Sequence, residues 1–305
     1  MRATRPRRTA AVLLTAALGL LPACTAAPAD DRPAASSGPA TATVHRVPLH
    51  GAVNVRDLGG YRTRDGHHVR YGQLFRADGL GGLTAADRGK LAGLGLRTVV
   101  DLRIPAEIAR DGADRLPRGV AVVSRPVPDS ELNDTTNAAL GSKDPDRQRK
   151  LLGNGRAERL MRATYRSFVS SAPSRRQFAA TLRDVADGKG TPLLFHCTAG
   201  KDRTGWLSYV LLRALGVPEA TATRDYLLSN RLRAAADRRT RAGLAKSGRM
   251  RDPELLTPLL EVREDYLRAA LDQADREYGG VDGYLTEGLG LDSGTLAALR
   301  SRLLR

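Results

Sequence analysis

Apolar and polar positions along this chain fall into two patterns, short apolar runs and longer segments with helical spacing. The short runs are rich in β-branched or large apolar residues, as buried strands are. They predict strands at residues 97–102, 120–124 and 192–197. The helical spacing predicts helices at residues 157–170, 175–186 and 202–215. Thr84 and Asp87 have the spacing of a capping box, which predicts a further helix ending near Gly93.

Strands separated by helical segments predict an α/β fold with a mostly parallel sheet flanked by helices on both faces. Ligands of such sheets bind at the carboxyl ends of the strands, where Asp101 and Cys197 fall. Residues 129–156 are polar and too long for an ordinary connection, so they predict a helical lid or a mobile insertion. Residues 231–251 are basic, and they predict either a second cover over the site, a surface for anions or a solvated helix.

Composition is that of a globular protein: 305 residues, 41% hydrophobic and 27% charged, enough for one domain with a sizeable core. The formal net charge of +16 favours anionic partners such as phosphorylated proteins or anionic lipid headgroups. The basic residues are interleaved with acids and form no stripe with aromatic residues, so no nucleic-acid partner is expected.

The N-terminus has the pattern of a bacterial export signal over residues 1–23, with a basic start and a short apolar core. Cys24 follows a small residue, as in a lipoprotein signal, so we expect either attachment to the cell membrane through lipidated Cys24 or simple secretion. Residues 24–43 are rich in Ala, Pro and Ser and predict a flexible tether. The predicted domain covers residues 44–305.

The chain contains only two cysteines, Cys24 and Cys197, so no internal disulfide framework is expected. No group of His, Cys and carboxylate residues has the spacing of a metal site. We therefore expect neither a metal nor another cofactor.

Residues 196–205 read His-Cys-Thr-Ala-Gly-Lys-Asp-Arg-Thr-Gly and lie between a predicted strand and a predicted helix. A loop of this kind can direct its backbone N–H groups at one anion, and the same groups favour the thiolate of Cys197. The planar guanidinium of Arg203 can bind two phosphate oxygens. The residues expected to bind phosphate are Thr198, Ala199, Gly200, Lys201, Asp202 and Arg203.

This loop resembles the signature of the protein tyrosine phosphatase superfamily. Residues 54–61, 74–78 and 99–103, with the tail at 265–290, are similar to the bacterial tyrosine-protein phosphatase family that includes secreted mycobacterial enzymes. The resemblance covers about residues 45 to 305. It implies a phosphatase catalytic domain that cleaves phosphate monoesters through a phosphocysteine on Cys197. The alternatives are a sulfurtransferase, which the closing Arg-Thr-Gly disfavours, and a non-catalytic phosphate-recognition module on the same fold.

The leaving oxygen needs a proton, and three carboxylates are candidates for the general acid. Asp202 is the first choice because some members of the resembling family use the loop aspartate. Asp129 is the second, because its surroundings resemble the acid-bearing loop of eukaryotic tyrosine phosphatases, and Asp101 is the third. Lys201 adds a charge that resembles phosphoinositide phosphatase loops, although a lysine that only points to solvent is the plainer interpretation.

Several further residues are expected to support the loop. His196 is expected to orient it through a ring hydrogen bond, and Thr204 to donate to the sulfur of Cys197. Arg56 is expected to pair with Asp57 and brace the loop. The remaining members of this polar network are Asn54, Arg76, Asp78, Asp101 and Arg103.

Overall fold

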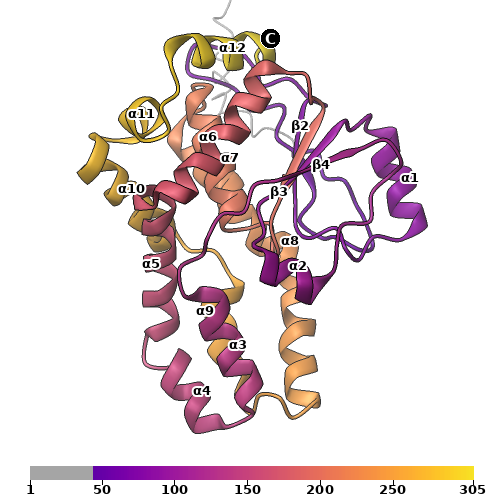
Figure 1. Cartoon of the computed structure of the whole chain (residues 1–305), viewed down its shortest axis with the longest axis vertical. Coiled ribbons are helices and arrows are strands. Elements are labelled where there is room, and N and C mark those ends of the chain that lie inside the picture. Colours follow the sequence, from indigo (N-terminus) through magenta and orange to yellow (C-terminus); the bar gives the residue numbers. More distant parts are fainter. Residues whose placement is uncertain (1–43) are drawn as a thin grey trace, which may run out of the picture. The chain divides into compact units, whose positions relative to one another are not determined.

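The computed structural model describes residues 44–305 (Figure 1). The predicted export signal, the tether and Cys24 lie outside the described residues. Five strands form one sheet in the order β1-β2-β5-β3-β4. Their bounds are β1 Arg56–Asp57, β2 Leu74–Ala77, β3 Thr98–Asp101, β4 Ala121–Ser124 and β5 Leu193–His196.

Strands β2, β5, β3 and β4 are parallel, and only β1 is antiparallel to its neighbour. The predicted mostly parallel sheet is therefore confirmed. In this register His196 at the end of β5 lies between Ala77 of β2 and Asp101 of β3. The carboxyl ends of the central strands thus meet directly below the Cys197 loop.

Helices connect and cover the strands. The bounds are α1 Ala85–Gly93, α2 Pro105–Asp111, α3 Leu132–Ser142, α4 Pro145–Leu152, α5 Arg156–Ser170, α6 Ala172–Asp187, α7 Arg203–Ala214, α8 Glu219–Lys246, η1 Pro253–Leu256, α9 Thr257–Leu260, α10 Glu264–Tyr278, α11 Val281–Gly283, η2 Tyr284–Gly288 and α12 Ser293–Leu303. The capping box of α1 is confirmed, since Thr84 accepts from the Asp87 amide and Asp87 accepts from the Thr84 amide. Helix α6 begins three residues before its predicted start, because Ser171 caps it.

The two faces of the sheet are covered unequally. Val99 and Leu194 point to one face, where they pack in a small core with Leu91 of α1. Val100 and Phe195, one position further along, point to the other face. They pack in the main core, to which α5, α6, α7, α10 and α12 contribute. Figure 1 shows α1 on one side of the sheet and the other large helices on the opposite side.

A third, separate hydrophobic cluster holds the lower group of helices in Figure 1 together. It contains Ala139 of α3, Leu152 of α4 and Leu256 of η1. Gln148 ties the same group together, because its Nε2 donates to the carbonyl oxygens of Ala139 (3.1 Å) and Arg249 (2.8 Å). Residues 129–156 are thus largely helical, whereas their movement as a lid stays a prediction. Most of the basic stretch at 231–251 is the last part of α8.

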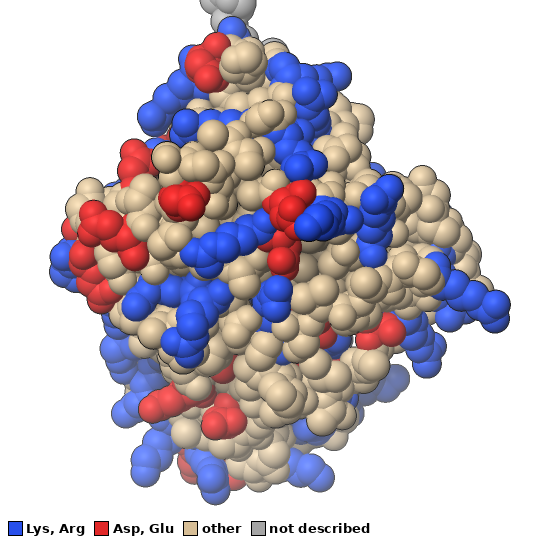
Figure 2. Space-filling model, turned by 45° about the horizontal axis from the view of Figure 1, so that its top comes forward, with Lys and Arg blue, Asp and Glu red and all other residues tan. Residues whose placement is uncertain are grey.

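Two surface properties bear on partners. Within residues 44–305, no helix combines the length and the apolar character needed to cross a membrane. Figure 2 shows Lys and Arg scattered over one face, with Asp and Glu between them in places.

Candidate phosphate-binding site

The loop between β5 and α7 surrounds a pocket of about 260 Å³, whose floor includes Cys197 and Arg203. Cys197 follows directly after β5 and is buried. Gly200 has a φ of +64°, and a Cβ at this position would collide with the backbone of Ala77 and Asp78. The loop therefore needs glycine here both for its turn and for its close approach to β2.

Four consecutive carbonyl oxygens of the loop, those of residues 197–200, contact side chains or amides around it. Cys197 O faces Nδ1 of His196 at 3.3 Å, and Thr198 O accepts from the amide of Gly79 at 3.1 Å. Ala199 O accepts from Arg233 of α8, and Gly200 O accepts from both Asn54 and Arg76. In a trans peptide the N–H group points opposite to the carbonyl oxygen. The amides that follow these carbonyls are consequently directed toward the pocket, where they can bind an anion.

Arg203, the first residue of α7, is fixed by Glu107 of α2. Its Nη1 and Nη2 each donate to one Glu107 carboxylate oxygen at 2.5 Å, and Thr198 Oγ1 donates to the same carboxylate at 2.6 Å. Burial alone raises the pKa of Glu107, but the hydrogen bonds and charge of Arg203 outweigh burial and lower it to about 2. Glu107 is therefore ionised at neutral pH.

The same pairing orients the rest of the guanidinium of Arg203. Nη1 also donates to Leu102 O at 3.3 Å, so both of its N–H bonds are used. Among the described residues, Nε and the second N–H of Nη2 have no acceptor. These two N–H groups form one edge of the planar fork, and such an edge matches two oxygens of one phosphate.

The three candidate carboxylates occupy different environments. Asp129 and Asp202 line the pocket with Cys197, and Asp101 does not. Asp101 accepts three hydrogen bonds from the Arg103 guanidinium and one from the Arg103 amide. Asp202 accepts from Lys201 Nζ at 2.8 Å and from Tyr165 Oη at 2.9 Å. Asp129 forms no ion pair within residues 44–305.

Opposite the loop, the pocket wall is apolar. It consists of leucine side chains from α3, α8, η1 and α9, together with threonine and asparagine side chains. The leucines are Leu132, Leu140, Leu244, Leu256, Leu259 and Leu260. The pocket therefore has a polar, cationic floor and an apolar wall.

The loop is backed by a buried network that differs from the prediction for Arg56. Arg56 and Arg76 both pair with Asp225 of α8, at 2.9 and 2.6 Å, and Tyr61 donates to the same carboxylate at 2.9 Å. The predicted pair between Arg56 and Asp57 is wrong, because neighbouring side chains in a strand point to opposite faces. Asp57 instead accepts from the turn amides of Gly59 and Gly72, each at 2.7 Å.

Arg56 still supports the loop, through Asn54. Its Nη1 donates to Asn54 Oδ1 at 2.6 Å, and Asn54 Nδ2 donates to Gly200 O at 2.9 Å. Asp78 fixes the backbone of the same segment, because its carboxylate accepts from the amides of Val53 and Asn54. The structure thus brings together the predicted supporting residues Asn54, Arg56, Arg76 and Asp78.

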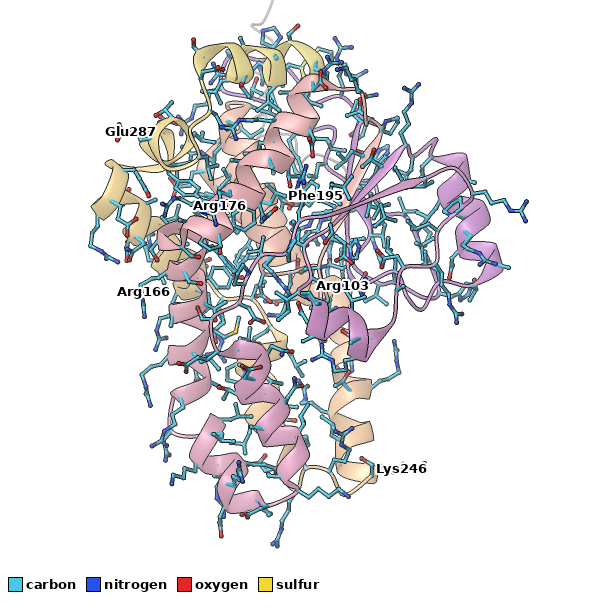
Figure 3. The ribbon with its side chains drawn as sticks, in the orientation of Figure 1. Arg103, Arg166, Arg176, Phe195, Lys246 and Glu287 are labelled. Atoms are coloured by element: carbon cyan, nitrogen blue, oxygen red, sulfur yellow. The ribbon has the colours of Figure 1, made fainter. Side chains whose placement is uncertain are left out.

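A second network lies behind Cys197. His196 Nε2 lies 2.8 Å from Asp114, and Arg103 pairs with both Asp101 and Asp114. Arg103 follows β3 and Phe195 lies within β5, and both residues are labelled in Figure 3. Asp101, Asp114 and His196 are close enough to one another to hold a metal ion. The guanidinium of Arg103 pairs with both carboxylates, so the group is an ion-pair network that contacts His196. That His196 orients the loop stays a prediction.

Thr204 and Lys201 differ from their predicted environments. Thr204 Oγ1 is buried without a hydrogen-bond partner among residues 44–305, so the predicted bond to the Cys197 sulfur is not formed. Its position in the first turn of α7 explains the difference. Lys201 does not point to solvent: its side chain is 3% exposed, and Nζ contacts Asp202 and the carbonyl oxygen of Glu261 (3.2 Å). Lys201 is therefore part of the pocket wall.

The acidic residues of the site that were not found from the sequence are Glu107, Asp114 and Asp225; Tyr165 and Arg233, which contact the loop, were not found either. A local signal existed only for Glu107, which follows Pro105 at the start of α2 and accepts from the Ile104 amide. This pattern indicates a helix start, whereas the contact with Arg203 depends on the fold.

The chain is similar to known proteins over most of its length. A model of the tyrosine phosphatase family matches residues 47–305. A protein of Cupriavidus necator named as a candidate tyrosine-protein phosphatase is 36% identical over 87% of this chain and 92% of its own length. The triple specificity protein phosphatase PtpB of Mycobacterium tuberculosis is 32% identical over 84% of this chain and 98% of its own. A tyrosine-protein phosphatase of Nostoc commune is 30% identical over 75% of this chain and 74% of its own.

Proposed function

Because the chain belongs to the tyrosine phosphatase family, we propose that it hydrolyses phosphate monoesters through a phosphocysteine on Cys197. The observation that carries the proposal is the free edge of Arg203, which Glu107 orients beside a loop whose amides are directed into the pocket. The thiolate of Cys197 attacks phosphorus, and the loop amides and Arg203 stabilise the charge on the phosphoryl oxygens. Water then hydrolyses the phosphocysteine and restores the thiolate.

Phosphotyrosine is the substrate side chain that we propose first. The apolar wall of leucines opposite Cys197 suits an aromatic ring, which gains by leaving water. The name of the mycobacterial relative, a triple specificity protein phosphatase, supports a substrate range wider than phosphotyrosine, and we propose that phosphoserine and phosphothreonine belong to it. Activity on phosphoinositides rests on Lys201 alone, and its pairing with Asp202 weakens that argument.

The alternative function is a recognition module that binds phosphate without turnover. Such a module would have the cationic floor of the pocket but would lack the nucleophile or a proton donor. Cys197 and two of the candidate acids, Asp129 and Asp202, line this pocket, which favours the enzyme.

The experiment that tests the proposal is acid quenching of the enzyme during turnover of a ³²P-labelled phosphotyrosine peptide. We expect the label in a covalent adduct that mass spectrometry assigns to Cys197. Phosphate release from phosphotyrosine, phosphoserine and phosphoinositide substrates, measured in parallel, ranks the substrates. A folded, reduced protein that binds phosphate but releases none from any of them would support the recognition module.

We also propose that the mature enzyme is exported and attached to the cell membrane through lipidated Cys24. The support is the sequence pattern of residues 1–24 alone. Replacing Cys24 by serine is expected to move the protein from the membrane fraction of its cells to the soluble fraction. If wild-type protein is already soluble outside the cells, simple secretion replaces this proposal.

A further inference from the structure

Building on the proposed phosphatase function, we propose that Asp129 is the general acid of the first step. Cys197 Sγ forms a bond to phosphorus, and the bond from phosphorus to the leaving oxygen breaks with its electron pair on that oxygen. The carboxyl proton of Asp129 passes to the leaving oxygen, and the carboxylate remains. In the second step water attacks phosphorus, the S–P bond breaks with its electron pair on Sγ, and one proton of the water returns to Asp129.

The backbone holds Asp129 at the pocket. Val127 donates its amide to Leu102 O at 3.1 Å, which ties this segment to the end of β3. The carbonyl oxygen of Asp129 accepts from the amide of Leu132 and from Thr164 Oγ1 of α5. Asp129 is 5% exposed and lines the same pocket as Cys197 and Arg203. The backbone contacts therefore hold Asp129 on the wall of the pocket that contains the nucleophile.

The surroundings of Asp129 favour the protonated form. The pKa of Asp129 is raised to about 6: burial is the largest cause, the positive charge of Arg203 opposes it, and the negative charge of Glu107 adds to it. The other charged or titratable groups on the pocket are Arg110 of α2 and the loop residues Cys197, Lys201 and Asp202. Helices α3, α8 and α9 contribute only uncharged side chains to the pocket. A substantial fraction of Asp129 thus carries a proton near pH 6.

The two other carboxylates are less suited to donate a proton. Asp101 is bonded to Arg103 and lies outside the pocket lining. Asp202 lines the pocket, but the ammonium group of Lys201 and the hydroxyl of Tyr165 both donate hydrogen bonds to it, so its oxygens are already engaged. The sequence favoured Asp202, and that assignment stays an untested prediction that the experiment below decides.

The test compares two substrates that differ in their need for an acid. A phosphotyrosine peptide releases a phenolate whose conjugate acid has a pKa of about 10, so its leaving oxygen needs a proton. p-Nitrophenyl phosphate releases a stabilised phenolate that needs little help. We expect Asp129→Asn to lower kcat/KM for the peptide by about 100- to 10,000-fold. The loss with p-nitrophenyl phosphate is expected to be much smaller.

A pH profile gives a second readout. Because the acid must be protonated, kcat/KM of the wild type for the peptide is expected to fall as pH rises through about 6. Asp129→Asn is expected to lack this descending limb. Asp134→Asn, which changes an exposed carboxylate in the first turn of α3, is the matched control and keeps wild-type values.

Two results would overturn the assignment: equal losses on both substrates in Asp129→Asn, or the leaving-group signature in Asp202→Asn instead. Inhibition by inorganic phosphate and the Tm of each variant report whether the pocket is still folded. A wild type that turns over neither substrate would refute the phosphatase function itself. A wild type active on both, with no selective loss in Asp129→Asn, would refute only the role of Asp129.

Discussion

Replacing Cys197 by serine is expected to reduce phosphate release to the background rate while phosphate binding is retained. A serine hydroxyl stays protonated at neutral pH, so it is a poor nucleophile toward phosphorus. The loop carbonyls that His196, Asn54, Arg76 and Arg233 hold do not depend on the sulfur, so the amides remain directed into the pocket. Phosphate release and the Kd for a phosphotyrosine peptide, measured on the same preparation, check both parts.

The matched control for this variant is Cys24→Ser, which makes the same change at the other cysteine of the chain. It is expected to keep full turnover in solution. Turnover by Cys197→Ser above a few per cent of the wild type would contradict a phosphocysteine mechanism. Loss of both turnover and peptide binding, with an unchanged Tm, would show that the sulfur is needed to shape the loop.

The loop was predictable because the residues that form it and its flanking elements are consecutive in the sequence. Residues 192–215 contain an apolar strand, a glycine-bearing turn and a helix in direct succession, and they appear as β5, the loop and α7. The predicted helix-flanked parallel sheet follows from the same regular alternation. Strands β1 and β2 were missed as strands because β1 has two residues, both charged, and β2 has an arginine within its four. Their pairing depends on partners elsewhere in the chain.

The acidic partners of the site's arginines could not be predicted from the neighbouring sequence. Asp225 lies within a long helix whose sequence gives no sign that the residue faces two buried arginines. Glu107 is about a hundred residues from Arg203, and only the parallel order of β3 and β5 brings α2 next to the loop. The sequence correctly predicted that Arg56 supports the loop. Its predicted partner, Asp57, was wrong, because the observed partner, Asp225, comes from helix α8.

Helices α3 and α4 were predicted as an inserted segment, but their packing was not. The length and polarity of residues 129–156 indicated an insertion, and the structure gives it two helices, which share a separate hydrophobic cluster with η1. Segments outside the main core can open locally at lower cost than elements of that core. The leucines that they contribute to the pocket wall would move with them. Movement of these helices as a lid stays a prediction.

Arg203→Lys is expected to lower kcat/KM about 1,000-fold, although the positive charge is kept. The ammonium group of lysine is a point charge and cannot replace the edge formed by Nε and Nη2, which is oriented to bind two phosphate oxygens because Glu107 holds the adjacent edge formed by Nη1 and Nη2. Glu107→Gln is therefore expected to lose activity as well, but less, since the fork remains and only its orientation is weakened. Steady-state kinetics on a phosphotyrosine peptide measure both losses.

Arg213→Lys is the matched control, because Arg213 lies on the same helix α7 and pairs with partly exposed Glu219 away from the pocket. Its kinetics are expected to equal those of the wild type. If Arg203→Lys kept more than a tenth of the wild-type kcat/KM, charge alone would account for the role of this residue. A Glu107→Gln variant with full activity would show that the loop and the substrate orient Arg203 without a carboxylate behind it. The bidentate geometry predicts neither result, because two parallel N–H bonds to one phosphate require the guanidinium plane to be fixed before the substrate arrives.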